Sequence, residues 1–151
     1  MSSDVMLRRM RQSDRPVVLS FRPGPFVDPI ADTLSAADPC RDNYVIEFDD
    51  VVVGFFQIDH QSNARKLPVD LELHEVQIDK RQQGKGIGKR FVGMLGLFLG
   101  RSYPAATGVC LTVNCRNHRA YHLYLRGGFV DTKALHRGGR SGPQHVMVRP
   151  L

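Results

Sequence analysis

The stretch Gln82-Gln83-Gly84-Lys85-Gly86-Ile87-Gly88-Lys89-Arg90 lies between an apolar run that ends at Ile78 and another that begins at Phe91. This order predicts a strand, a glycine-rich turn and the start of a helix. Glycine lets the backbone curl tightly and lets a ligand approach the main chain. The amides of such a turn and of the first helical residues point at one spot, where the helix dipole favours an anion. The stretch therefore predicts a site for a phosphate or pyrophosphate.

The glycine spacing distinguishes between kinds of phosphate loop. The loop of nucleoside triphosphatases has four residues between its first glycine and Gly-Lys-Ser/Thr. Here three residues separate Gly84 from Gly88, and Arg90 stands in place of the hydroxyl residue. The dinucleotide-binding fingerprint is G-x-G-x-x-G, whereas these glycines alternate. The pattern that fits is Gln83-x-x-Gly86-x-Gly88.

A second motif follows after an intervening helix and strand, in the segment Asn117-His118-Arg119-Ala120-Tyr121-His122-Leu123-Tyr124-Leu125-Arg126-Gly127-Gly128-Phe129. Asn117 is a favourable N-cap residue, and Ala120, Leu123 and Tyr124 share one helical face by their spacing. Gly127 suits a helix end that needs a left-handed residue. The segment predicts a helix over residues 119–126 and then a strand.

Together the two motifs resemble those of the GNAT family of N-acetyltransferases, which are Arg/Gln-x-x-Gly-x-Gly/Ala for the coenzyme A pyrophosphate loop and, later, N-x-x-A-x-x-L-Y-x-x-x-G-F. The resemblance is close over residues 69–135. It implies the GNAT fold, a mixed α/β domain with a mostly antiparallel central sheet and flanking helices. It also implies acetyl-CoA as the acyl donor. The donor would be held by the amides of Gln83, Gly84, Lys85, Gly86, Ile87, Gly88 and Lys89, by the main chain of Gln77 and Ile78, and by Asn117.

Apolar patterning and turn residues locate the other elements. We expect strands over residues 5–10, 44–48, 51–58, 69–78, 109–113, 129–135 and 144–148, and helices over 13–21, 29–34, 86–100 and 119–126. Ser13 and Asp28 are the expected caps of the first two helices. The order is that of an α/β domain with helices on a central sheet.

The strand over residues 69–78 changes its phase part-way. Leu71 and Leu73 alternate on one parity, whereas Val76 and Ile78 alternate on the other. A slip of one residue predicts a β-bulge at His74-Glu75. The family resemblance implies that this strand also splays from its neighbour and opens a slot for the pantetheine arm. The alternative is that both bulge residues simply face solvent.

Catalytic candidates follow from the resemblance. Tyr124 stands where the family has a tyrosine that gives a proton to the coenzyme A sulfur, and a phenol of pKa ~10 suits a thiolate of similar basicity. The alternative is a tyrosine packed in the core. The general base is expected at Glu72, six residues before Ile78, or at Glu75, with His74 close by. A covalent route through Cys115 would need an activated thiolate.

Composition bounds the class of protein. The chain has 151 residues, 42% hydrophobic and 24% charged, which predicts one globular domain over residues 1–151. Its net charge of +6 attracts anions such as coenzyme A, but the basic residues form no stripe, so we expect no nucleic-acid partner. We expect no membrane partner, since no apolar run approaches about 18 residues, and no metal, since no ligand spacing is present. Three cysteines without C-x-x-C spacing favour reduced thiols in a cytoplasmic protein.

The sequence therefore predicts an N-acetyltransferase that moves the acetyl group of acetyl-CoA directly to a primary amine in a ternary complex. The acceptor, a small molecule or a peptide, is left open, and a homodimer is a further possibility by analogy with family relatives. The alternative is a non-catalytic acyl-CoA-binding sensor or interaction module. Tyr124 favours an enzyme, because a binding protein has no use for a leaving-group acid.

Overall fold

The computed structural model describes residues 4–26, 29–61, 69–138 and 141–151. Their strands form a seven-stranded sheet in the order β1-β2-β3-β4-β5-β7-β6. The strands are β1 (Val5–Arg9), β2 (Arg41–Phe48), β3 (Val51–Asp59), β4 (Leu71–Ile78), β5 (Gly108–Asn114), β6 (Val130–His136) and β7 (Gln144–Pro150). The helices are η1 (Gln12–Asp14), α1 (Arg15–Leu19), α2 (Ile30–Ser35), η2 (Lys80–Gln82), α3 (Ile87–Ser102) and α4 (His118–Arg126), of which η1 and η2 are 3-10 helices.

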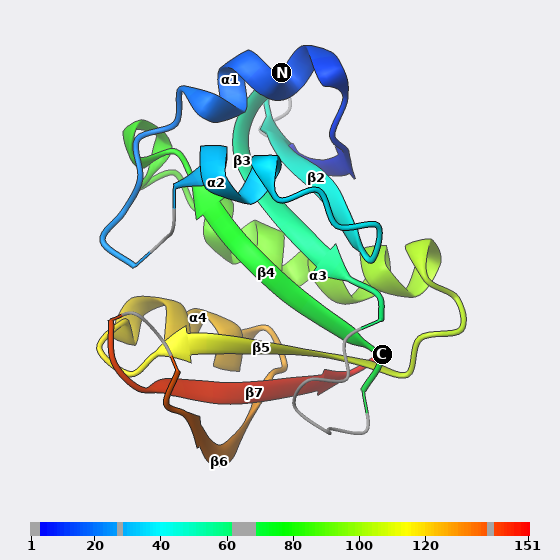
Figure 1. Cartoon of the computed structure of the whole chain (residues 1–151), viewed down its shortest axis with the longest axis vertical. Coiled ribbons are helices and arrows are strands. Elements are labelled where there is room, and N and C mark those ends of the chain that lie inside the picture. The colour runs from blue at the N-terminus through cyan, green and yellow to red at the C-terminus, as the bar shows by residue number, and fades with distance from the viewer. Residues whose placement is uncertain (1–3, 27–28, 62–68, 139–140) are drawn as a thin grey trace.

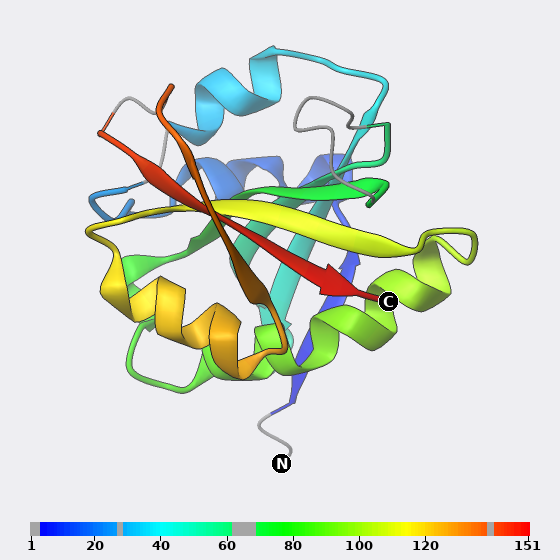
Figure 2. The same ribbon diagram turned by 90° about the horizontal axis from the view of Figure 1, so that it is seen from below.

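The sheet is covered on both faces, by α1 and α2 on one side and by α3 and α4 on the other (Figures 1 and 2). β4 and β5 are the parallel pair, and the other described pairs are antiparallel. The expected fold class, a mixed and mostly antiparallel sheet with flanking helices, is confirmed. Each predicted strand is present, with its ends moved by a few residues.

Two apolar layers hold the sheet. Under α3 lies a large core that includes Phe56, Phe91, Leu95 and Leu99, each at most 1% exposed. These helix residues recur every four positions and so share one face. The opposite layer joins Val18, Phe21 and Ile30 of the α1–α2 region to Val45 and Phe55. Since β3 is buried on both faces, its continuous run Val53–Ile58 is apolar apart from Gly54 and Gln57.

The bulge and the splay of β4 are both present. In the register with β3, Phe55 faces Gln77 and Gln57 faces His74, so one extra residue lies on β4. Glu75 takes up that residue with a left-handed backbone, φ 57°. On its other side β4 pairs with β5 only at Leu71–Val109 and Glu72–Cys110, after which the two strands diverge (Figure 1). The phase change therefore marks the point where the sheet opens.

Two sequence expectations about helix ends were wrong. Ser13 does not cap a helix over 13–21, because it lies inside η1 and Asp14 is the residue that precedes α1. Gly127 is not left-handed, with φ −82°, and it is Gly128 that has φ 94°. Gly127 is required for a different reason, since a Cβ there would lie 1.8 Å from Val92 Cγ1. The expected cap Asp28 lies outside the described residues.

A cluster of ion pairs connects β1 with η1 and with β2. Arg8 donates to both carboxylate oxygens of Asp14, at 2.8 and 2.9 Å, and also to Glu47. The Asp14 carboxylate accepts the Arg11 amide at 2.7 Å. The hydrogen bond from Arg8, helped by the Arg11 amide and outweighing the effect of burial, lowers the pKa of Asp14.

Asp14→Asn is expected to destabilise the fold at pH 7 by about 1–3 kcal/mol, the usual contribution of a hydrogen bond to a charged group. Because the folded pKa of Asp14 lies below its ordinary 3.8, its contribution is complete above that pH and is lost as the pH falls through the lower folded value. The variant should therefore lose less stability than the wild type between pH 5 and pH 2. Thermal melts across this range test it, with exposed Asp32→Asn as the control; equal acid sensitivity of wild type and Asp14→Asn would contradict it.

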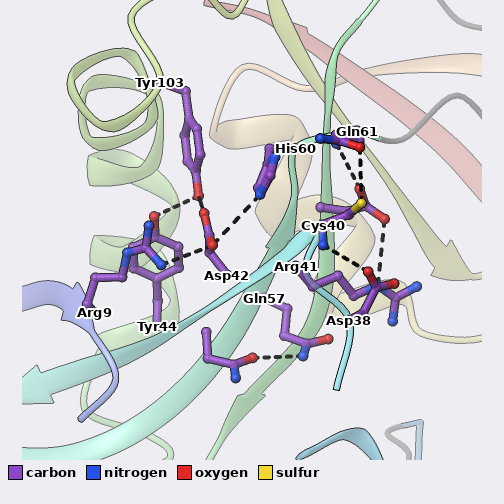
Figure 3. A network of polar contacts seen from close by, with 12 residues as sticks. Arg9, Asp38, Cys40, Arg41, Asp42, Tyr44, Gln57, His60, Gln61 and Tyr103 are labelled. Atoms are coloured by element: carbon purple, nitrogen blue, oxygen red, sulfur yellow. Dashed lines mark hydrogen bonds and ion pairs between the residues drawn. The ribbon is translucent and has the colours of Figure 1, made fainter. Parts of the chain in front are cut away.

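The end of α3 is tied to β2 by a polar network (Figure 3). The Tyr103 hydroxyl donates to Asp42 at 2.6 Å and lies 2.7 Å from the Tyr44 hydroxyl, and Arg9 pairs with Asp42 at 3.0 Å. Burial, with the hydrogen bond to Asp42, raises the pKa of Tyr103. The 16 residues of α3 span about 24 Å. The network thus anchors the helix at the end remote from the glycine-rich turn.

Candidate active site

A cleft of about 820 Å³ lies where β4 and β5 diverge. This volume falls in the range of small-molecule sites. Its walls come from six parts of the chain: the loop before α2, the bulged part of β4, the glycine-rich turn, the end of β5, α4 and the start of β7. The described lining residues are Gly24–Phe26, Leu73–Ile78, Gln82–Gly84, Gly86–Lys89, Leu111–Asn114, Asn117, Arg119, Ala120, His122–Tyr124, Arg126 and Gln144.

The glycine-rich turn closes one end of the cleft and is built for close approach of a ligand. Gly84 and Gly86 are left-handed, with φ 86° and 75°, and a Cβ on either would meet no atom within 4 Å. Gly86 is the N-cap of α3, and the first helical hydrogen bond runs from the Arg90 amide to the Gly86 carbonyl at 3.1 Å. The amides of Ile87, Gly88 and Lys89 precede that bond and so have no intrahelical acceptor. Open space over unpaired amides fits a pyrophosphate.

Basic side chains line the cleft, but Lys85 of the glycine-rich turn is not among them. Lys89 lines the cleft, and α4 adds Arg119 and Arg126, which the sequence analysis did not single out. Lys85 is not a lining residue, and its Nζ donates to Gln82 Oε1 at 2.7 Å. Among the described lining residues, Glu75 carries the sole carboxylate. The potential of the cleft is therefore positive at the turn and less so near the bulge.

Tyr124 is another lining residue of the cleft. It comes from α4, packs its ring against Phe129 with centroids 5.5 Å apart, and is 8% exposed. Burial raises the pKa of the Tyr124 hydroxyl. The group therefore keeps its proton at neutral pH and can release it only to a strongly basic atom in the cleft.

Asn117 caps α4, as its position in the second motif predicted. Its side-chain oxygen accepts the Ala120 amide at 3.3 Å. That bond does not use the side-chain NH₂ group, and Asn117 also lines the cleft. Gln77 and Ile78 line it as well, on the free edge of β4 beyond the bulge. The predicted donor-binding residues other than Lys85 therefore all line one cleft.

The candidate bases occupy different positions. Glu75 lines the cleft at the bulge, whereas Glu72 is 3% exposed and is not a lining residue. His74 lies between them in the chain and lines the cleft, with Nε2 3.5 Å from Glu72 Oε1. Cys115 is not a lining residue, and its amide donates to Pro143. This placement gives no support to a covalent route through Cys115.

The mouth of the cleft is bridged by an arginine that sequence patterns did not reveal. Arg116 follows β5, lies 5.8 Å from the ring centroid of Phe26, and donates to the Ser141 carbonyl at 2.6 Å. Asn114 donates to the same carbonyl at 3.1 Å. Arg116 thus connects the loop before α2 with the loop before β7.

Comparison with known proteins identifies the family. Residues 40–131 match the family model of the acetyltransferase (GNAT) domain. The chain belongs to the GNAT family. It is 34% identical over 123 residues to the uncharacterized N-acetyltransferase YbbJ of Bacillus subtilis (strain 168), an alignment that covers 77% of this chain and 76% of YbbJ. This GNAT protein is accordingly an acetyltransferase.

Solved structures share the GNAT fold of the chain. One is the spermidine N-acetyltransferase of Vibrio cholerae in complex with CoA and spermine, with a TM-score of 0.70, 19% identity and coverage of 99% of this chain and 96% of that one. Another is the aminoglycoside N(6')acetyltransferase of Legionella pneumophila, with a TM-score of 0.75, 16% identity and coverage of 99% and 94%. At such low identity the likeness concerns the fold alone.

Two further features of this acetyltransferase concern the described residues. None of the helices there combines the length and apolar character needed to cross a membrane. Nor do the described histidines, cysteines and carboxylates gather in any group of three or more that would hold a metal ion.

Proposed function

We propose that this protein moves the acetyl group of acetyl-CoA to a primary amine by direct transfer in a ternary complex. The observation that carries the proposal is a single cleft with an anion site at one end and a proton-bearing phenol in its wall. Gly84 and Gly86 leave open space over the main chain for a pyrophosphate, and Tyr124 and the bulge of β4 line the same cleft.

Each part of the cleft has a task in this proposal. The amides from Gln83 to Lys89 bind the pyrophosphate. The main chain of Gln77 and Ile78, which pairs with β3 but has no β5 partner among the described residues, binds the pantetheine arm. Holding both reactants in line lowers the barrier by up to ~7–11 kcal/mol. The donor supplies an acyl group already activated as a thioester. Tyr124 gives its proton to the departing sulfur.

The acceptor is proposed to be a primary amine that carries positive charge. The carboxylate of Glu75 lies on the lining near the bulge, which favours a cation there. Two of the solved structures with this fold are named as N-acetyltransferases of spermidine and of aminoglycosides, which are amines. We extend only the amine class to this chain, because those likenesses rest on the fold.

Two measurements test the proposal. Acetyl-CoA should raise the melting temperature by mass action on the folded state. Release of free thiol should then accelerate when an amine is added, in a panel of spermidine, an aminoglycoside, a lysine peptide and a peptide with a free α-amine. No thermal shift at millimolar acetyl-CoA would remove the donor. A shift without turnover of any amine would favour the binding-module alternative.

Arg116→Ala is expected to raise the KM for the acceptor about 5- to 30-fold, or about 1–2 kcal/mol. The loop that carries the lining residue Phe26 would lose its cation–π contact and its link to the Ser141 carbonyl. The binding of acetyl-CoA should be unchanged, because Arg116 belongs neither to the glycine-rich turn nor to the cleft lining. Steady-state kinetics with each substrate varied in turn separates the two effects. Arg101→Ala, an exposed change near the end of α3, is the control. A loss of donor affinity equal to the loss of acceptor affinity would contradict the assignment.

A further inference from the structure

His74 lies in an unusual polar environment beneath the cleft. Val45 pairs with Phe55, and both pack against the α1–α2 layer. Alternation along β3 puts Gln57 and Asp59 on that same face. Since Gln57 faces His74 and Asp59 faces Glu72 across the ladder, His74 and Glu72 also lie on the α1–α2 face. The four polar side chains of Gln57, Asp59, Glu72 and His74 therefore lie on the sheet face that is otherwise covered by the apolar α1–α2 layer.

Two polar atoms of this group lack hydrogen bonds. Gln57 donates its NH₂ group to Asn43 at 2.8 Å, but its buried Oε1 has no hydrogen-bond partner among the described residues. The same holds for the buried Nε2 of His74, whose neighbour Glu72 Oε1 lies 3.5 Å away. Leaving such atoms unsatisfied costs about 1–3 kcal/mol each. A fold that keeps them next to a cleft has retained polar groups that packing alone would disfavour.

We propose that His74 is the general base that deprotonates the acceptor amine, and that Glu72 is the positioning residue behind it. The proposal rests on the function proposed above. His74 reaches the cleft and Glu72 does not. Nε2 faces Glu72, so the carboxylate favours a proton on that nitrogen and leaves the lone pair on Nδ1. A histidine whose second nitrogen lies beside a carboxylate, here at 3.5 Å, is the arrangement of a base and its orienting group.

The proton balance of the step closes within the site. The acceptor nitrogen attacks as a neutral amine, after its ammonium proton has passed to solvent. As this nitrogen forms its bond to the acetyl carbon, His74 Nδ1 takes the proton that it then loses. As the carbon–sulfur bond breaks, Tyr124 gives its hydroxyl proton to the sulfur. The products are an amide and a thiol. His74 has gained one proton and Tyr124 has lost one, and transfer through solvent restores both.

The decisive variant is His74→Ala, assayed with the panel amine that gives the highest turnover. We expect kcat to fall about 100-fold or more, the usual contribution of a general base, with an unchanged thermal shift from acetyl-CoA. Added imidazole should restore kcat at least tenfold in His74→Ala. The control variant His118→Ala changes an exposed histidine outside the cleft. It should turn over at the wild-type rate with or without imidazole. His74→Asn keeps a polar side chain and serves if the alanine variant fails to fold.

A double-mutant cycle tests the positioning role of Glu72. Glu72→Gln alone should lower kcat about tenfold, whereas the double variant Glu72→Gln/His74→Ala should be no slower than His74→Ala. A kcat of His74→Ala within threefold of the wild type would overturn the proposal. So would multiplicative losses in the double variant, which would make Glu72 act independently of His74. If the wild type turned over no amine at all, the proposed function would fail instead.

Discussion

Gly86→Glu is expected to abolish the binding of acetyl-CoA, with a rise in Kd of at least 100-fold, or about 2.7 kcal/mol. Two effects act together. Gly86 has φ 75°, a conformation that costs about 1–2 kcal/mol for a residue with a side chain. The new carboxylate would also stand at the N-cap of α3, in the space over Gly86 that we assign to the pyrophosphate, and would repel it.

Matched variants separate the two effects. Gly86→Ala adds the backbone strain without the charge, so its loss of affinity should be intermediate. Gly93→Glu adds the same side chain at an exposed position of α3, where a Cβ meets nothing within 4 Å and φ is not left-handed. It should bind acetyl-CoA normally and gain up to about 1 kcal/mol of helix stability. Calorimetric titration with acetyl-CoA measures all three, and normal binding by Gly86→Glu would place the pyrophosphate elsewhere.

Local sequence was sufficient for the turn and for the bulge because both are properties of consecutive residues. Alternate glycines between a strand and a helix specify the turn, whose left-handed positions the structure has at Gly84 and Gly86. The parity change between Leu73 and Val76 specifies the bulge, which the structure has at Glu75. Alternation has a period of two residues, so one extra residue must appear as a change of phase.

Glycines that serve tertiary packing could not be understood in this way. The glycines of α3 are an example. A Cβ on Gly96 would lie 2.0 Å from the guanidinium of Arg149 on β7, whereas on Gly93 or Gly100 it would meet nothing within 4 Å. Gly127 likewise makes room for Val92 of another helix. The partners are remote in the chain, so no local pattern contains them.

The cleft shows the same difference between local motifs, which sequence reveals, and contacts between remote residues, which it does not. The predicted donor residues belong to two continuous motifs, and all but Lys85 line the cleft. Arg116 and Phe26 form the bridge at its mouth across 90 positions of sequence, which no motif spans. The sequence analysis named Glu72 before Glu75 as the expected base because of its position relative to the family motif. In the structure Glu72 is buried, and its Oε1 lies 3.5 Å from His74 Nε2.

Tyr124→Phe is expected to lower kcat about 100-fold while the Kd for acetyl-CoA stays within twofold. A positioned general acid contributes about 100- to 10,000-fold, and phenylalanine keeps the ring and its contact with Phe129. No hydrogen bond joins the Tyr124 hydroxyl to the described residues. Removing a buried hydroxyl of this kind should leave stability unchanged or slightly higher.

Tyr121→Phe is the matched control on the same helix. Tyr121 does not line the cleft, and its hydroxyl donates to Asp131 at 2.9 Å. This variant should lose about 1 kcal/mol of stability and keep its full kcat, the reverse of the result for Tyr124→Phe. Pre-steady-state thiol release and thermal melts on both variants measure the two quantities. If Tyr124→Phe lost donor affinity and turnover equally, the hydroxyl would be shaping the cleft, and the proton for the leaving sulfur would have to come from another group.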